Sequence, residues 1–351
     1  MNIHGGYRGD LSKVIDLSIN INPSGPPKGM KEGFQELFST LRHYPSIDGS
    51  VYEKRLKKRF NLGGEVLLGN GAMELIYLFA RSTKGRRVMI IQPTFNEYER
   101  AFFVAGWEIS HFLLSEEADF QLDLTVLEKR IRKERPDVLV LCHPNNPTGT
   151  VQTDQTLADL CNLLEGFSIP LMLDGSFIDF FEGGWSTLPE RIRQFIAGKG
   201  IGICSLTKFY GIPGVRLGYA FGGEDIMEKM SRKKEPWTIN AFAFQALEWI
   251  LEDHDFEGKT LRWLKSERKF MDTELKGVRG IKSYPSKVNF SFVKAYGRNK
   301  DRLQQALLEK GVYIRSCTDF YGLDEKYYRF AIGSRTENEK LITALKEAGD
   351  L

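Results

Sequence analysis

The sequence predicts an α/β protein, in which helices cover both faces of a mostly parallel sheet and a smaller α+β domain follows. From about residue 66 to 222, short apolar runs alternate with amphipathic segments of helix length. Runs that are apolar on both faces are typical of buried parallel strands. After about residue 236, long helical segments precede the strands. The chain of 351 residues is long enough for one large domain and a smaller one.

The predicted strands and helices of the first part alternate along the chain. The strands are expected at 65–70, 86–92, 107–114, 137–143, 169–174 and 201–205. The helices are expected at 71–82, 95–106 and 124–134. Each run has the apolar spacing of its element, with a period of 3.6 for the helices and continuous hydrophobicity for the buried strands.

The second part has a different order of elements. Helices are expected at 239–254, 259–276, 301–310 and 337–349, and strands at 288–294, 312–316 and 327–333. At the other end of the chain, residues 1–28 contain three prolines and predict an extended arm that packs against a body. We therefore expect an arm (1–28), a large domain (29–236) and a linking helix with a small domain (237–351). Residues 29–50 belong to the large domain or contribute to the small one.

Composition and charge exclude several classes of function. The formal net charge is +3, from 49 basic and 46 acidic residues, which does not indicate a nucleic-acid binder. No apolar stretch reaches the ~18 residues of a membrane span, and the first residues contain no signal-peptide core. The four cysteines and five histidines do not cluster, so we expect reduced thiols, no metal site and a cytoplasmic location.

A lysine without an obvious surface explanation stands in the stretch SLTKFYGIPGVRLGY. Lys208 follows the apolar run IGIC, Ser205 and Thr207 precede it, and Arg216 lies eight residues later. An amine near a desolvated pocket has a lowered pKa and can form a Schiff base with a carbonyl group. Hydroxyls and a bidentate cation beside it are suited to a phosphate. This stretch therefore predicts a nucleophilic lysine next to a phosphate site.

Other polar residues follow the neighbouring predicted strands, and ligands of parallel sheets bind beyond the carboxyl ends of the strands. Asp174 ends the apolar strand IPLMLD, where a carboxylate needs a partner such as a protonated pyridinium nitrogen. In HPNNPTG, Asn146 could donate to a phenolic oxygen. The segment GNGAMEL begins a helix directly after a strand, so the amides of Gly71, Ala72 and Met73 would extend the phosphate site.

These motifs, in this order, resemble the fold-type I pyridoxal-phosphate enzymes of aminotransferase class I/II. The likeness rests on Asn70-Gly71, HPNNPTG, Asp174, the S-x-T-K element with its arginine, and YYRFAI, and it spans nearly the whole chain. It implies a seven-stranded, aspartate-aminotransferase-like large domain. Within this family the segments HGG, LSININPSGPP, RHYPSIDG and PTFNEYERA are similar to those of threonine-phosphate decarboxylases of cobalamin biosynthesis, which are near relatives of histidinol-phosphate aminotransferases.

The resemblance implies a role for each matching residue. Lys208 would form the Schiff base with pyridoxal 5'-phosphate and move protons, Asp174 would pair with the ring nitrogen, and Asn146 would bond the ring hydroxyl. Further cofactor contacts are expected from Phe95, Ser205, Thr207, Arg216, Gly71, Ala72, Met73 and, in the neighbouring subunit of a homodimer with shared sites, Tyr52.

The resemblance also implies substrate contacts, and it leaves the reaction open. Arg329, in YYRFAI, matches the arginine that grips the substrate α-carboxylate. His4 and Arg315 are the candidates for a second anion, the phosphate of a phosphorylated amino acid. We expect decarboxylation of that substrate. The alternatives are an aminotransferase of the histidinol-phosphate type and a pyridoxal-phosphate binding module without catalysis.

Two departures from the family pattern bear on the substrate. Many relatives have D-E-[AS]-[FY] where this chain has Asp174, Gly175, Ser176 and Phe177. Gly175 removes a carboxylate, and Phe177 cannot supply the phenol that transaminases often place there. The arm has Tyr7 where the decarboxylases typically have asparagine, so its contact with the substrate is expected to differ.

Overall fold

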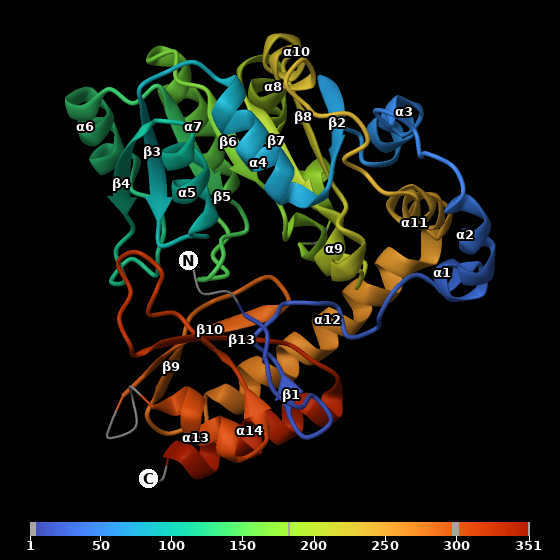
Figure 1. Cartoon of the computed structure of the whole chain (residues 1–351). Coiled ribbons are helices and arrows are strands. Elements are labelled where there is room, and N and C mark those ends of the chain that lie inside the picture. Colours follow the sequence, from blue (N-terminus) through green and yellow to red (C-terminus); the bar gives the residue numbers. More distant parts are fainter. Residues whose placement is uncertain (1–4, 182, 297–301, 350–351) are drawn as a thin grey trace.

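The computed structural model describes residues 5–181, 183–296 and 302–349. Figure 1 shows a large sheet flanked by helices in the upper part of the molecule, and a smaller sheet with its own helices in the lower part. The long helix α12 (His254–Leu275) runs diagonally from the upper body into the lower one. The predicted α/β class is confirmed.

Seven strands form the large sheet, in the order β2-β8-β7-β6-β5-β3-β4. They are β2 (Glu65–Gly69), β3 (Arg87–Gln92), β4 (Glu108–Leu113), β5 (Val138–Cys142), β6 (Leu171–Asp174), β7 (Ile201–Ser205) and β8 (Gly218–Gly222). Strand β8 runs antiparallel to β2 and β7, and every other neighbouring pair is parallel. All residues of β5 to β8 are buried, which explains why their sequences are continuously apolar.

Helices pack on both faces of this sheet, because alternate strand residues point to opposite sides. Ile90 and Met172 belong to one apolar core, which also contains residues of α4, α5 and α10. Met89 and Leu171 belong to the other core, with residues of α6, α7 and α8. The helices are α4 (Gly71–Ser82), α5 (Glu97–Val104), α6 (Leu124–Glu134), α7 (Asp154–Gly166), α8 (Glu190–Lys199) and α10 (Glu224–Ser231).

The lower body contains a four-stranded antiparallel sheet in the order β12-β13-β10-β9. Its strands are β9 (Ile281–Ser283), β10 (Phe290–Ala295), β12 (Arg315–Ser316) and β13 (Tyr327–Ala331). Helices α13 (Leu303–Glu309) and α14 (Arg335–Gly349) pack against each other, and α14 also packs against α12. The predicted helices and the strands near 288–294 and 327–333 are confirmed, whereas β9 was not predicted.

The single strand predicted over 312–316 is wrong. The segment forms β11 (Val312–Tyr313) and β12, which join different partners. Strand β11 pairs in parallel with β1 (Ile15–Asp16) of the N-terminal arm, and β12 pairs with β13. The chain changes partner at Ile314, which is fully buried. A strand contributed by the distant arm leaves no local signal at 312–316.

The arm lies along the lower body (Figure 1). The carbonyl of Leu17 accepts a hydrogen bond from the amide of Ala331 at 2.8 Å. The helices that follow are α1 (Lys28–Glu32), α2 (Phe34–Thr40) and α3 (Ser50–Arg59), and all three contact α11 (Ala241–Glu252). The predicted domain boundaries at residues 28 and 236 stay a prediction.

Three expectations from composition concern thiols, membranes and metals. All four cysteines are free and buried, as expected. In the part of the chain that the structure describes, no helix combines the length and the apolar character that a membrane crossing requires. Among the same residues, no group of three or more His, Cys, Asp or Glu side chains is arranged to hold a metal ion.

Candidate active site

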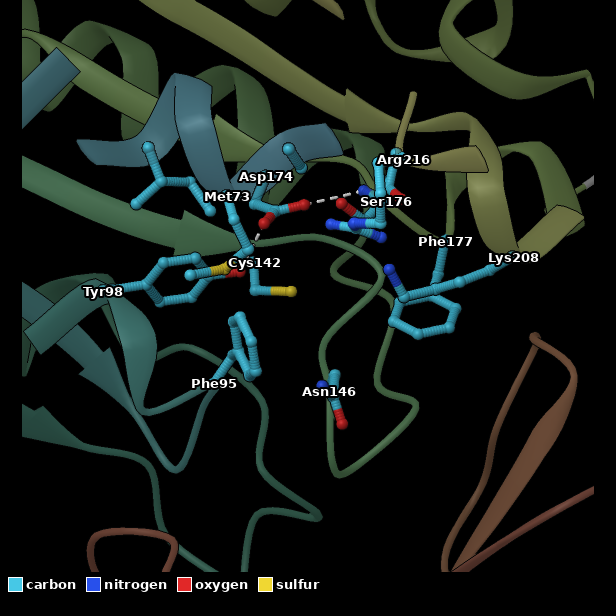
Figure 2. Close-up of a pocket in the computed structure, with 13 residues that line it drawn as sticks. Met73, Phe95, Tyr98, Cys142, Asn146, Asp174, Ser176, Phe177, Lys208 and Arg216 are labelled. Carbon is cyan, nitrogen blue, oxygen red and sulfur yellow. Dashed lines mark hydrogen bonds between the residues drawn. The ribbon is translucent and has the colours of Figure 1, made fainter. Parts of the chain in front are cut away.

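The predicted functional residues meet at the carboxyl edge of the large sheet. Asp174 ends β6, Ser205 ends β7 and Cys142 ends β5, while Gly71 begins α4 directly after β2. Asp174, Ser205 and Cys142 line a cavity of about 480 Å³, part of which is open to solvent, whereas Gly71 precedes the lining residues Ala72 and Met73. Figure 2 shows its lining, which consists of Ala72, Met73, Ile76, Phe95, Tyr98, Cys142, Asn146, Asp174, Ser176, Phe177, Ser205, Lys208 and Arg216.

Lys208 reaches into this cavity from a short helix. Helix α9 (Leu206–Phe209) begins immediately after β7, so the lysine lies one turn beyond the sheet edge. Its Nζ is 5.4 Å from the ring centroid of Phe177 (Figure 2). Removal from water lowers the pKa of the Lys208 amine, and the carboxylate of Asp174 opposes this shift. A lowered pKa increases the fraction of the neutral, nucleophilic amine near neutral pH.

Asp174 is buried and held by two hydrogen bonds. The phenol of Tyr98 donates to Oδ2 at 2.7 Å, and the amide of Ser176 donates to Oδ1 at 2.7 Å. Burial, followed by the charge of Asp174, raises the pKa of Tyr98 well above its usual value, so the phenol remains a donor. Within the described residues, Asp174 has no salt bridge. A buried carboxylate with neutral donors alone is suited to a cationic ligand group.

A site suited to an anion lies where α4 begins. Gly71 has φ +77°, and a Cβ at this position would lie 2.4 Å from Nη2 of Arg216. Glycine thus lets the guanidinium approach the first turn of α4, where backbone amides point outward. Arg216 itself has φ +60°, a conformation that costs a non-glycine residue about 1 kcal/mol and is found at functional sites. Ser205 adds its hydroxyl, which lies 2.8 Å from that of Thr207.

Two consecutive asparagines in HPNNPTG have different environments. Asn145 is satisfied by the turn and by the loop after β3, because its Nδ2 donates to Oγ1 of Thr148 at 2.8 Å and to the carbonyl of Pro93 at 2.9 Å. Asn146 instead lines the cavity, and its Oδ1 accepts a hydrogen bond from Nη1 of Arg329. Because arginine can only donate, this contact leaves the Asn146 Nδ2 as a donor toward the cavity.

A second cavity adjoins the first and shares Phe95, Asn146, Phe177, Lys208 and Arg216 with it. It has about 970 Å³ of empty space, including open solvent. Its further lining comes from the arm, the start of α5, the lower body, and α9 with the segment after it, namely Gly5, Ser18, Ile19, Asn20, Ile21, Asn96, Thr207, Pro213, Arg315 and Arg329. The two bodies and the arm therefore enclose a space beside Lys208 that is large enough for a substrate.

Two buried arginines line this second cavity. They lie directly opposite each other on neighbouring strands, in the register Arg315 to Arg329. Arg329 donates from Nη2 to the carbonyl of Ser18 at 2.9 Å, and its buried Nε has no partner among the described residues. Burial lowers the pKa of Arg329 to about 10, so its guanidinium remains charged at neutral pH. Both arginines can therefore bind anions.

The structure does not place every predicted residue in the cavities. Tyr52, on α3, packs on Phe244 with ring centroids 5.1 Å apart and does not line either cavity of its own chain. His4 lies outside the described residues. Tyr7 packs on Tyr313 with centroids 5.1 Å apart, so the unusual residue of the arm contacts the lower body. Thr207 lines the second cavity only.

Sequence reasoning missed several residues that line the cavities. Tyr98 lies inside an ordinary amphipathic helix, and nothing in its sequence context reveals the contact with Asp174. Asn20 lies in the arm, is 5% exposed and has a buried Oδ1 without a partner among the described residues. Asn22, by contrast, bonds the carbonyl of Phe209 and the hydroxyl of Thr260. Asn20 and Asn22 are two residues apart in LSININP, a spacing that places both side chains on one face of an extended segment, so nothing in the sequence indicated that their environments differ.

Solved structures with a similar fold define the class of the protein. The histidinol-phosphate aminotransferase of Clostridium acetobutylicum has a TM-score of 0.87 at 29% identity, over 95% of this chain and 98% of that one. The L-threonine-O-3-phosphate decarboxylase of Porphyromonas gingivalis has a TM-score of 0.81 at 27% identity, over 95% and 99%. The fold and the site define a pyridoxal-phosphate-dependent enzyme.

Sequence comparison identifies the family. The family model of aminotransferase class I and II matches residues 12–345, and the chain belongs to this family. The threonine-phosphate decarboxylase of Salmonella typhimurium is 35% identical over 341 residues, which cover 95% of this chain and 91% of that protein. The resemblance, the aspartate-aminotransferase-like fold and the cofactor that the sequence predicts are thereby confirmed.

The residues present fit pyridoxal 5'-phosphate. The buried carboxylate of Asp174 lacks a cationic partner among the described residues, which matches a protonated ring nitrogen. At the other end of the cavity, the glycine at position 71 and the guanidinium of Arg216 leave a cradle that a Cβ would fill. Lys208, whose pKa is lowered, lines the same cavity beside Phe177 (Figure 2). Carboxylate, amine and anion site thus occur in one cavity, as this cofactor requires.

Proposed function

We propose that this enzyme decarboxylates a phosphorylated amino acid. The substrate that fits best is L-threonine O-3-phosphate, which would give (R)-1-aminopropan-2-yl phosphate for cobalamin biosynthesis. One observation carries the proposal: two buried arginines, Arg315 and Arg329, line the cavity beside Lys208 from adjacent strands. Such a pair can bind a substrate with two anionic groups, and the similarity to threonine-phosphate decarboxylases supports this choice.

The residues of the first cavity would hold the cofactor. When bound, pyridoxal 5'-phosphate supplies an aldehyde that captures the substrate amine and a ring that accepts the electron pair of the broken Cα bond. Asp174 would keep the ring nitrogen protonated, and the Asn146 Nδ2 would donate to the ring hydroxyl. Phe95 would cover one face of the ring. Ser205, Arg216 and the first amides of α4 would bind the phosphate, with Gly71, Ala72 and Met73 supplying those amides.

Lys208 has two tasks in this proposal. Its Nζ would hold the cofactor covalently. As a free amine it would lie beside the reacting substrate, where it would hold a proton and deliver it to the substrate Cα in place of the lost carboxylate. The hydrophobic ring of Phe177, 5.4 Å from Nζ, limits the access of water to the amine.

The cofactor would activate one bond at the substrate Cα, and the side chains that orient the substrate would decide which bond that is. Arg329 would bind the α-carboxylate, while Arg315, with His4 from the arm, would bind the phosphate. Two anchors fix the rotation about the Cα–N bond, whereas a single anchor does not. Asn20, buried and without a hydrogen-bond partner for its Oδ1 among the described residues, is an additional candidate for contact with the substrate.

The second candidate function is an aminotransferase of the histidinol-phosphate type. The high structural similarity to such an enzyme favours it. The same lysine could then move a proton from Cα of the substrate, with the carboxylate kept. A pyridoxal-phosphate binding module without catalysis is disfavoured, because Lys208 lies in the cavity with a lowered pKa.

We also propose that the enzyme acts as a homodimer with shared sites. Five large apolar side chains in and between α2 and α3 are exposed, and they are Phe38, Leu41, Tyr44, Ile47 and Val51. Tyr52 follows this group and does not line a cavity of its own chain. In a dimer formed through this surface, Tyr52 would reach the cofactor phosphate of the neighbouring subunit.

Incubation of the holoenzyme with O-phospho-L-threonine tests the reaction. We expect stoichiometric release of CO2 and formation of 1-aminopropan-2-yl phosphate without a keto acid. The control is histidinol phosphate with 2-oxoglutarate, which should give no glutamate. Glutamate formation without CO2 release from O-phospho-L-threonine would reject the decarboxylase in favour of the second candidate.

A further inference from the structure

A carboxylate of the lower body holds one of the two arginines and reaches the upper body. Asp319 accepts hydrogen bonds from Nη2 of Arg315 at 2.6 Å and 2.7 Å, one to each carboxylate oxygen. From the upper body, the Nδ2 of Asn96 donates to the carbonyl of Asp319 at 2.8 Å and to its Oδ2 at 3.1 Å. Asn96 directly follows Phe95, which lines both cavities. Asp319 therefore connects Arg315 to the residues around the cofactor cavity.

The loop that carries Asp319 is fixed against the edge of the large sheet. The ring of Tyr321 stacks on His111 with centroids 3.9 Å apart and an interplanar angle of 16°. Gly322 lies so close to Leu113 that a Cβ at position 322 would be 2.2 Å from Cδ1 of the leucine. These contacts hold the carboxylate at a defined position, since both His111 and Leu113 belong to the regular strand β4.

Asp319 also supplies a negative charge beside the two buried arginines. Arg315 and Arg329 are 6% and 7% exposed and lie directly opposite each other, an arrangement in which like charges repel. The acceptors of Arg329 are neutral, namely the amide oxygen of Asn146 and the carbonyl of Ser18. Among the described residues, the carboxylate of Asp319 forms its ion pair with Arg315, while its charge also acts on Arg329 and opposes the lowering of that arginine's pKa by burial.

We propose that Asp319 is a specificity-determining residue, which restricts Arg315 to substrate groups that carry two negative charges. The inference rests on the proposed function, because it takes Arg315 as the site of the distal anion. A guanidinium that is already paired with a carboxylate gains little by exchanging it for another carboxylate. A phosphate monoester carries a charge of about −1.5 to −2 at pH 7 and three acceptor oxygens, so it competes successfully.

Spectroscopic titration of the holoenzyme tests the inference. O-phospho-L-threonine and L-glutamate both form a Schiff base through the amine, and they differ in the charge of the distal group. The measured quantity is the ratio of their dissociation constants. We expect the wild type to favour O-phospho-L-threonine strongly, and Asp319→Asn to reduce this preference at least about tenfold through tighter binding of glutamate, which corresponds to about 1.4 kcal/mol. Asp319→Glu, which keeps the charge, should retain most of the preference.

Asn96→Ala is the matched control, since it removes the contact between the two bodies and leaves the charge of Asp319 in place. It should weaken both ligands by a similar factor, so that the ratio stays the same. An unchanged ratio in Asp319→Asn would overturn the inference, as would an equal change in Asn96→Ala. Asp319→Ser provides a second neutral substitution if Asp319→Asn does not fold. If the wild type prefers O-phospho-L-threonine but releases no CO2 from it, the proposed decarboxylation is wrong, while the inference about Asp319 stands.

Discussion

The indole of Trp185 occupies the space beside Gly175, where a Cβ would lie 2.4 Å from Cζ2 of the tryptophan. Trp185 is 3% exposed and packs edge-on against Phe221, with ring centroids 4.7 Å apart. Its Cη2 would also lie 3.1 Å from a Cβ at position 202. The family pattern that the sequence resembles has glutamate at the position of Gly175. In this chain the indole of Trp185 occupies the space that a side chain at position 175 would need.

Gly175→Ala should therefore destabilise the fold by about 1–3 kcal/mol, because the indole and the flanking strands cannot separate without strain. In Gly175→Ala with Trp185→Phe, the smaller ring should relieve part of the clash. The loss of stability in the double variant should then be smaller than the sum of the two single losses by at least ~0.5 kcal/mol. Urea unfolding at fixed protein concentration measures all three values. Additive losses would show that the two residues do not share this space.

Asp179, close to Trp185, should make stability depend on pH. Burial, then the charge of Glu257, raises the pKa of Asp179 to about 7, while Arg59 opposes the shift. The folded protein thus binds the proton more tightly than the unfolded chain, whose pKa is 3.8. The resulting stabilisation is complete below the unfolded value and is lost as the pH rises through about 7.

Asp179→Asn should remove this dependence. We expect the variant to exceed the wild type in unfolding free energy by roughly 2–4 kcal/mol at pH 8 and by much less at pH 5. Urea unfolding at both pH values measures the difference. Asp255→Asn, with its carboxylate exposed on α12, is the control and should follow the wild type. If the unfolding free energies of Asp179→Asn and the wild type differ by the same amount at both pH values, Asp179 is not the source of the pH dependence.

Lys208→Ala should abolish the visible absorption of the Schiff base between the cofactor and the enzyme. The turnover number should also fall by about 100-fold to 10,000-fold, because the proton donor is lost. The spectrum before and after borohydride reduction, together with the rate of CO2 release, measures both effects. Lys199→Ala is the control, since Lys199 is exposed and pairs with Glu165 at the surface. Retention of a reducible band in Lys208→Ala would show that another amine carries the cofactor.

Tyr98→Phe should weaken the hold on the ring nitrogen without changing the shape of the cavity. It removes the 2.7 Å hydrogen bond to Asp174 and leaves the donor from Ser176. A hydrogen bond to a charged group contributes about 1.5–3 kcal/mol, so the cofactor affinity should fall roughly 10-fold to 150-fold. Asp174→Asn should also lower the cofactor affinity, and it should lose most of the turnover as well. Fluorescence titration of the apoenzyme with pyridoxal 5'-phosphate measures the affinity; equal affinity in Tyr98→Phe would remove the phenol from the site.

Arg329→Lys should behave as a severe substitution. The planar guanidinium of Arg329 donates to Asn146 and to Ser18 at the same time, and the ammonium group of a lysine cannot reproduce this geometry. We expect KM for the amino acid to rise at least about tenfold, because the loss of a charge-assisted hydrogen bond costs about 1.5–3 kcal/mol. Steady-state kinetics provide the measurement, with Arg335→Lys as the control on the exposed start of α14. A KM equal to that of the wild type would place the carboxylate elsewhere.

Local sequence predicted many of the residues that line the first cavity. Strands β5, β6 and β7 are continuously apolar, so their boundaries and the polar residues after them, Asn146, Asp174 and Ser205, could be identified directly. The parallel arrangement then brings these residues to one edge of the sheet. In the lower body the prediction was weaker, since the strand over 312–316 divides between two sheets and β9 has only three residues.

The sequence by itself determined the α/β fold, the lysine, the aspartate and the residues suited to a phosphate, because each follows a strand whose apolar pattern is local. Only the tertiary structure decided which other residues surround the lysine, the aspartate and the residues suited to a phosphate. Tyr98 meets Asp174 across 76 positions of the chain, and Asn96 meets Asp319 across 223. Such contacts depend on how helices, arm and lower body pack, and packing is a property of the whole chain. The first cavity combines strand-end residues with one such distant contact, that of Tyr98, whereas the second cavity is lined by residues of the arm, the lower body and the large sheet's edge.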